Sequence, residues 1–148
     1  MNQKYEITDI VHPQYPWLHR IRALRDVRED VHAGDLGGFV QSEENLSQEG
    51  QCWVANNAVA AEESYISGDA IMWDYSCARG CAVISGKSRI GGEAIIEDHA
   101  IVTSGYVHGN GHISGNAKIF ANAVTGGTHV IQEKTSLYGG LCGQSQRH

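Results

Sequence analysis

Residues 64–102 read SYISGDAIMWDYSCARGCAVISGKSRIGGEAIIEDHAIV, and a small residue returns there at every sixth position. The small residues of this column, extended toward the N-terminus, are Cys52, Ala58, Ser64, Ala70, Ser76, Ala82, Ser88, Ala94 and Ala100. A second column stands two positions later and consists of aliphatic residues, alanine and methionine: Val54, Ala60, Ile66, Met72, Ala78, Ile84, Ile90, Ile96 and Val102. An ordinary alternating strand has a period of two, so it does not explain a period of six.

Beyond Ala100 the repeat loses one residue and then continues. The small column resumes at Gly105, Gly111, Ala117 and Ala123. The second column resumes at Val107, Ile113, Ile119, Thr125 and Ile131 and ends at Leu137. Gly-containing dipeptides such as Gly68-Asp69 and Gly92-Glu93 stand just before small residues, and they suit tight corners between short strands.

Each hexad predicts one short strand and one corner, so three hexads form one coil of a triangular prism. We expect an all-β fold, a single-stranded parallel β-helix of about five coils, whose strands stack at a spacing of ~4.8 Å. The aliphatic column points inward and forms the main stabilising core. Hexapeptide prisms are usually left-handed, an exception to the right-handed rule for parallel crossovers.

The residues before the hexads have a different pattern. Segments 4–11 and 17–24 both alternate between apolar and polar residues, and the turn-forming sequence His12-Pro13-Gln14-Tyr15-Pro16 separates them. They predict a β-hairpin that caps the first coil and protects its open edge. We therefore expect an N-terminal hairpin and lead-in cap over 1–40, the β-helix over 41–139 and a flexible tail over 140–148.

Composition limits the classes of function. The chain has 148 residues, the size of one domain, and a formal net charge of −6, which argues against nucleic acid as a partner. No apolar run is long enough to span a membrane, and no secretory signal is seen, so we expect a cytoplasmic protein and no membrane partner. The four cysteines are then free thiols, and their spacing predicts no metal site.

The most specific residues precede the regular hexads. They are AGDLGGFV at 33–40, NLSQEGQCWV at 45–54 and HRIRALRD at 19–26. With the repeats that follow, they make the chain resemble the YdcK-like proteins over most of its length. These are bacterial and phage-encoded hexapeptide-repeat proteins that are often labelled acyltransferases. The resemblance implies a left-handed β-helix but no particular activity, because a fold does not define a function.

Residues directly after the small positions are expected to point outward and to stack along the three faces. The first of these columns is Val59, Cys77, Ile95, His112 and Val130. The second is Tyr65, Val83, Ile101 and Lys118, and the third is Ile71, Arg89, Tyr106 and Val124. The first two are mainly apolar, which predicts an interface in a homodimer or homotrimer. The alternative is that β-branched residues simply suit half-exposed strands.

Three of the eight histidines are candidate catalytic residues. The acyltransferase resemblance implies a histidine that acts as a general base. His99 occupies a corner, and His108 and His112 lie directly after the shortened hexad. By the coil spacing, His108 stacks over Gly91, near Trp73. The alternative is that these histidines are ordinary polar residues on the surface of a rod.

These observations favour a non-enzymatic protein that acts by protein binding or self-assembly, and the resemblance implies a phage or prophage type that interferes with a host system. Its partners would be further copies of itself or a host protein, and no cofactor is expected. The alternative is an acyltransferase that uses acetyl-CoA or another acyl-CoA thioester, with a histidine general base at a subunit seam. A weaker third idea is that a subunit groove sequesters a small nucleotide. Arg79 and Arg89 look isolated, so the sequence offers no basic cluster for a CoA phosphate.

Overall fold

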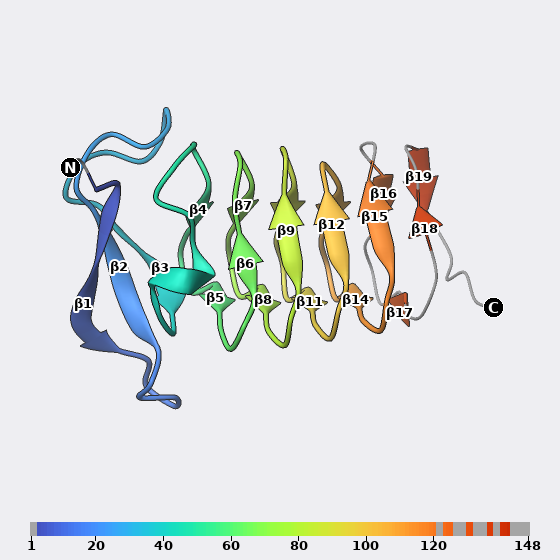
Figure 1. Cartoon of the computed structure of the whole chain (residues 1–148), viewed down its shortest axis with the longest axis horizontal. Helices are drawn as coiled ribbons and strands as arrows, with labels where there is room; N and C mark the ends of the chain where they lie inside the picture. The colour runs from blue at the N-terminus through green and yellow to red at the C-terminus, as the bar shows by residue number, and fades with distance from the viewer. Residues whose placement is uncertain (1–2, 121–122, 126–129, 132–135, 138–139, 143–148) are drawn as a thin grey trace.

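The computed structural model describes residues 3–120, 123–125, 130–131, 136–137 and 140–142. Short strands wind around one long axis into a parallel β-solenoid, which lies horizontally in Figure 1. The all-β, parallel β-helix predicted from the hexads is therefore confirmed. The left-handed sense of its winding stays a prediction.

The solenoid has three faces, called A, B and C below. Face A contains β5 (Val59–Ala60), β8 (Cys77–Ala78), β11 (Ile95–Ile96), β14 (His112–Ile113) and β17 (Val130–Ile131). Face B contains β6 (Tyr65–Ile66), β9 (Val83–Ser85), β12 (Ile101–Thr103), β15 (Lys118–Phe120) and β18 (Ser136–Leu137). Face C contains β4 (Trp53–Val54), β7 (Ile71–Met72), β10 (Arg89–Ile90), β13 (Tyr106–Val107), β16 (Ala123–Thr125) and β19 (Gly140–Cys142). The tail predicted over 140–148 thus begins with β19, and 143–148 lie outside the described residues.

Strand pairing follows the columns of the hexad. Ile71 pairs with Arg89, and Arg89 pairs with Tyr106, so the second step along the chain is one residue shorter than the first. This pairing confirms the residue missing after Ala100. The inward column forms the core, and its fully buried larger members are Val54, Ile66, Met72, Ile84, Ile90, Ile96, Val102, Val107, Ile113 and Ile119. Each of these side chains contributes about 1.5–3 kcal/mol on burial.

The corners between faces use left-handed backbone conformations. Gly68, between faces B and C, has φ of 66°, and a Cβ atom there would lie 2.9 Å from the backbone nitrogen of Gly86 in the next coil. Asp74 and Asp98 have φ near 60° at other corners. Their carboxylates accept hydrogen bonds from backbone N–H groups of the next coil, which offsets part of the strain of a non-glycine residue.

The N-terminal segment forms the predicted hairpin. β1 (Tyr5–Val11) pairs antiparallel with β2 (His19–Ala23), and β2 pairs antiparallel with β3 (Leu36–Val40). β3 joins face A beside β5, and a short 3-10 helix, η1 (Glu43–Asn45), leads into the first coil. Figure 1 shows the hairpin in blue at the N-terminal end of the solenoid.

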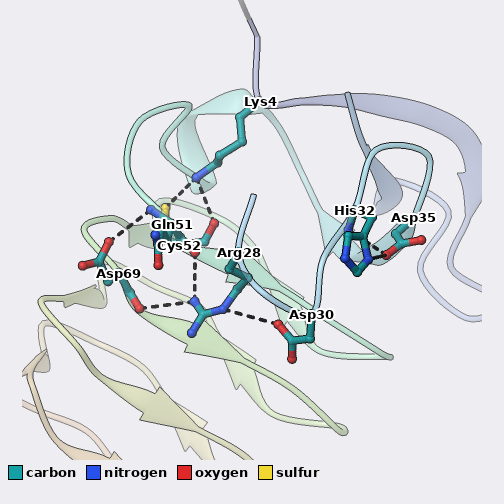
Figure 2. Close-up of polar contacts among 8 residues, drawn as sticks. All are labelled: Lys4, Arg28, Asp30, His32, Asp35, Gln51, Cys52 and Asp69. Atoms are coloured by element: carbon teal, nitrogen blue, oxygen red, sulfur yellow. Dashed lines mark hydrogen bonds and ion pairs between the residues drawn. The ribbon is translucent and has the colours of Figure 1, made fainter. Parts of the chain in front are cut away.

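Lys4 is a charged side chain that is buried against the first corner of the solenoid (Figure 2). Its Nζ donates to the carbonyl oxygens of Cys52 at 2.8 Å and Glu49 at 3.2 Å, and it lies 3.1 Å from the Cys52 Sγ. Burial lowers the pKa of Lys4, although the Cys52 thiol acts in the opposite direction. The ammonium group satisfies carbonyl oxygens that the first coil leaves without a neighbouring strand.

Candidate functional site

His112 and Glu97 form a pair on face A. His112 lies in β14, and Glu97 directly follows β11, the neighbouring strand. The Nε2 atom of His112 is in hydrogen-bond contact with the Oε2 atom of Glu97. The other carboxylate oxygen accepts a hydrogen bond of 2.8 Å from the Nε of Arg79. Arg79, which looks isolated in the sequence, is therefore part of a three-residue polar cluster.

The cluster keeps a carboxylate next to an imidazole at a partly exposed position. Burial acts to raise the pKa of Glu97, but the hydrogen bonds from Arg79 and His112 outweigh it and hold that pKa below its ordinary value. The same carboxylate raises the pKa of Arg79. A carboxylate in this position orients a histidine, and the His112 side chain, 34% exposed, remains open to solvent.

The other two candidate histidines lie elsewhere on the solenoid. His108 follows β13 on face C, where its ring lies 4.6 Å from that of Tyr106. His99 is exposed at a corner and lines a shallow groove of about 600 Å³ with Lys118 and Cys81. The described structure therefore does not bring the three histidines together, and only His112 has an acidic partner that orients it.

The predicted column on face A stacks as expected. Val59 pairs with Cys77, Cys77 with Ile95, and Ile95 with His112 and then Val130. The start of the column is covered by the chain itself. Val59 packs against a cluster of Leu18, Phe39 and Ala61, to which the N-terminal segment contributes the first two. The available part of face A is thus Cys77, Ile95 and His112, next to the charges of Arg79 and Glu97.

The predicted column on face B is open along three coils. Tyr65 is 41% exposed, and Val83 and Ile101 are half-buried. The outward residues beside this column carry hydroxyl groups and no charge: Ser67, Ser85 and Thr103. Lys118 follows as the next member of the column. Face B therefore carries a strip of uncharged side chains, called the face B strip below, and its Val83 and Ile101 also line the shallow groove beside His99.

An acidic corner separates faces A and B. Glu62, Glu63 and Asp98 are exposed there, between the strands of the two faces. The thiol of Cys81 donates to the Glu63 carboxylate at 3.3 Å, and this hydrogen bond raises the pKa of Cys81. The two apolar columns that the sequence predicts for an interface therefore lie on two separate surfaces.

Neither Arg79 nor Glu97 stands out in the sequence as a site residue. The signal was present, because Arg79 and Glu97 occupy equivalent positions in successive coils and His112 lies in the coil after that. Among the described residues, no group of three or more His, Cys, Asp or Glu side chains could hold a metal ion. None of the helices in the described part of the chain is long and apolar enough to cross a membrane.

Comparison with known proteins adds no family. No protein-family model matches the sequence, and no curated protein matches it either. The resemblance to the YdcK-like proteins therefore stays a prediction, and function has to be argued from the geometry of the chain.

Proposed function

We propose that this chain is a non-enzymatic binding protein that associates with a second copy of itself through the face B strip. The observation that supports this function is the strip itself, which keeps Tyr65, Val83 and Ile101 open to solvent over three coils. Its flanking hydroxyl groups carry no charge. An exposed, uncharged strip of this kind is typical of a protein interface.

The spacing of the strip favours a second copy as the occupant. The strands of this solenoid stack at ~4.8 Å. The outward side chains on the face B strip of one copy therefore repeat at the same distance as those of a second copy. The side chains of Val83 and Ile101 can then interdigitate with their equivalents along several coils. The Arg79–Glu97 pair lies on face A, and the acidic corner lies outside the strip. Close approach of two strips therefore brings few like charges together.

The oligomeric state tests this proposal. We expect light scattering and sedimentation to give at least a dimer for the wild-type chain. Ile101→Asp places a charge in the strip and should shift the protein to monomer, because a buried unpaired carboxylate is strongly unfavourable. Ile95→Asp is the matched control, since Ile95 is a half-buried isoleucine at the equivalent hexad position on face A.

The outcomes of this experiment separate the surfaces. Loss of association in Ile101→Asp alone supports face B. Loss in Ile95→Asp alone would place the interface on face A and contradict the proposal. A monomeric wild-type protein at all accessible concentrations would also contradict it.

A second function, acyl transfer from a CoA thioester, is favoured by one observation, the pairing of His112 with Glu97. A carboxylate that holds an imidazole prepares it to take a proton from a substrate hydroxyl or amine. If this function holds, acetyl-CoA should bind in calorimetry, and the protein should release free CoA in the presence of an acceptor. His112→Ala should lower the rate by about 100-fold or more, the usual contribution of a general base. An absence of acetyl-CoA binding would eliminate this function.

A further inference from the structure

A groove runs between the N-terminal segment and face C, away from the face B strip. It has a volume of about 560 Å³, and its lining includes Arg28, Asp30, Asp35, Trp53, Trp73 and Arg89. This volume lies within the ~300–1,000 Å³ that small-molecule sites usually have. The groove therefore has the size of a ligand site, and neither self-association nor the His112 pair uses it.

One wall of the groove is held in place by hydrogen bonds (Figure 2). The Arg28 guanidinium donates to the backbone carbonyl of Gln51 at 2.9 Å, and its Nε lies 3.7 Å from the Asp30 carboxylate. Asp35 accepts a hydrogen bond of 2.8 Å from the backbone nitrogen of His32. Asp30 and Asp35 nevertheless remain open to solvent, with 78% and 49% of their side chains exposed. This wall thus presents two solvent-exposed carboxylates that can accept hydrogen bonds.

The opposite wall continues into an aromatic platform on face C. A Cβ atom at Gly91 would lie only 2.7 Å from the indole of Trp73, so the indole lies directly over this glycine. The Trp73 ring is stacked with that of Tyr106, with centroids 6.3 Å apart and planes 26° apart. His108 adds a third ring, 4.6 Å from Tyr106. The three rings form one surface that extends from the groove along the axis of the solenoid, and we call it the Trp73 platform.

Arg89 stands between the groove and the platform. Its side chain is exposed, and within the described part of the chain it makes no hydrogen bond or ion pair. It therefore offers several N–H donors to the groove from the strand that pairs with Tyr106.

We propose that the groove and the Trp73 platform bind a neutral oligosaccharide. Sugar hydroxyls both donate and accept hydrogen bonds, so they can use the carboxylates of Asp30 and Asp35 together with the guanidinium of Arg89. The C–H face of a sugar ring is apolar and stacks on aromatic rings. The groove is open toward the platform, so it suits a chain of sugar units.

The charges of the site argue against the other ligand classes. The carboxylates of Asp30 and Asp35 balance the charges of Arg28 and Arg89, so the groove has no net positive charge to hold a phosphate or uronate group on a chain of net charge −6. A purely apolar ligand would leave the carboxylates and Arg89 without partners, which is costly on burial. A neutral ligand that carries many hydroxyl groups satisfies both the polar wall and the aromatic platform.

Calorimetric titration of the full chain with three neutral hexasaccharides, maltohexaose, cellohexaose and chitohexaose, tests this inference. Polygalacturonate and AMP serve as the anionic comparison. We expect at least one of the neutral hexasaccharides to bind, and Trp73→Ala to weaken that binding by about tenfold. Trp73→Phe keeps an aromatic ring and should retain most of the affinity. Arg89→Ala changes an exposed side chain and should also weaken binding.

Trp17→Ala is the matched control, because it removes an exposed indole ring in the turn between β1 and β2, outside the groove lining, and should leave sugar binding unchanged. The inference is overturned if none of the three neutral hexasaccharides binds at millimolar concentration. It is also overturned if polygalacturonate or AMP binds more tightly than all of them, or if Trp73→Ala and Arg89→Ala bind as well as Trp17→Ala. None of these outcomes bears on self-association through face B, so the two proposals fail separately.

Discussion

The small residues of the hexad differ in how their polar atoms are satisfied. The Ser76 hydroxyl can donate a hydrogen bond to either of two carbonyl oxygens, that of Trp73 at 2.9 Å or that of Ile90 at 3.2 Å. The buried Ser64 hydroxyl has no hydrogen-bond partner among the described residues. The small position therefore requires a side chain of small volume. A serine hydroxyl at this position is favourable only where it can donate a hydrogen bond to a nearby carbonyl group.

Ser64→Ala and Ser76→Ala should therefore affect the free energy of unfolding differently. Removing the unsatisfied hydroxyl of Ser64 should raise the free energy of unfolding or leave it unchanged, because alanine already fills the equivalent positions of other coils. Removing the Ser76 hydroxyl should lower it by about 1 kcal/mol. Urea unfolding of the two variants measures both values, and a larger loss for Ser64→Ala than for Ser76→Ala would contradict this account.

At the same scale, the sequence could place side chains on faces but could not predict their contacts. The coil spacing puts Ile95 beside His112 and Arg79 in the coil before Glu97, and the strand pairing agrees. Whether the Glu97 carboxylate turns toward His112 depends on side-chain rotamers, which a repeat does not specify. His99 and His108 lie near His112 in the sequence, but the coil spacing puts His99 at a corner and His108 on face C near Trp73, and the structure agrees.

At the scale of elements, the hexads predict strand positions well because every inward residue must be aliphatic or small. The segment between β2 and β3 follows no such period. It nevertheless folds over face C, where Val31 is buried and Arg28 reaches the backbone of Gln51. Its position depends on contacts between residues far apart in the sequence. The groove that it forms with Trp73 was therefore not predictable from the pattern.

The contact between the start of β1 and the first coil should make stability depend on pH. The pKa of Lys4 is lowered by burial, so the unfolded chain binds more protons than the folded chain between that lowered pKa and the ordinary value of 10.5. The free energy of unfolding should therefore rise with pH through this window. We expect the free energy of unfolding to rise for the wild type, relative to Lys4→Met, when urea unfolding is compared at about pH 7.5 and about pH 9.5, because groups common to both proteins cancel in this comparison.

Lys87→Met is the control for the Lys4 prediction, because Lys87 is exposed at a corner of the solenoid. Its replacement should leave the pH dependence of the wild type unchanged. If Lys4→Met and the wild type respond to pH in the same way, the buried ammonium group has no part in the stability of the first coil.

At the scale of the whole molecule, one repeat produces three faces of different chemistry. Face A carries the Arg79–Glu97–His112 cluster, face B the uncharged strip, and face C the Trp73 platform. The core imposes the inward residues, and the outward positions remain free to vary from face to face. The architecture could therefore be predicted from the sequence. Which surface each face exposes could not, because it depends on the positions of the corners and of the N-terminal segment in the folded chain.

The net charge of the chain gives a prediction that distinguishes face B from a charged interface. Each copy carries a formal charge of −6, so two copies repel each other at long range while the uncharged strips attract at contact. Raising the ionic strength from about 0.01 M to about 0.15 M shortens the screening length from about 30 Å to about 8 Å and weakens that repulsion. We expect the dimer dissociation constant, measured by sedimentation, to fall over this range, and Ile101→Asp to remain monomeric throughout. An interface held by ion pairs, such as one between Arg79 and Glu97 of two copies, would weaken with added salt, and that result would exclude the face B strip as the contact.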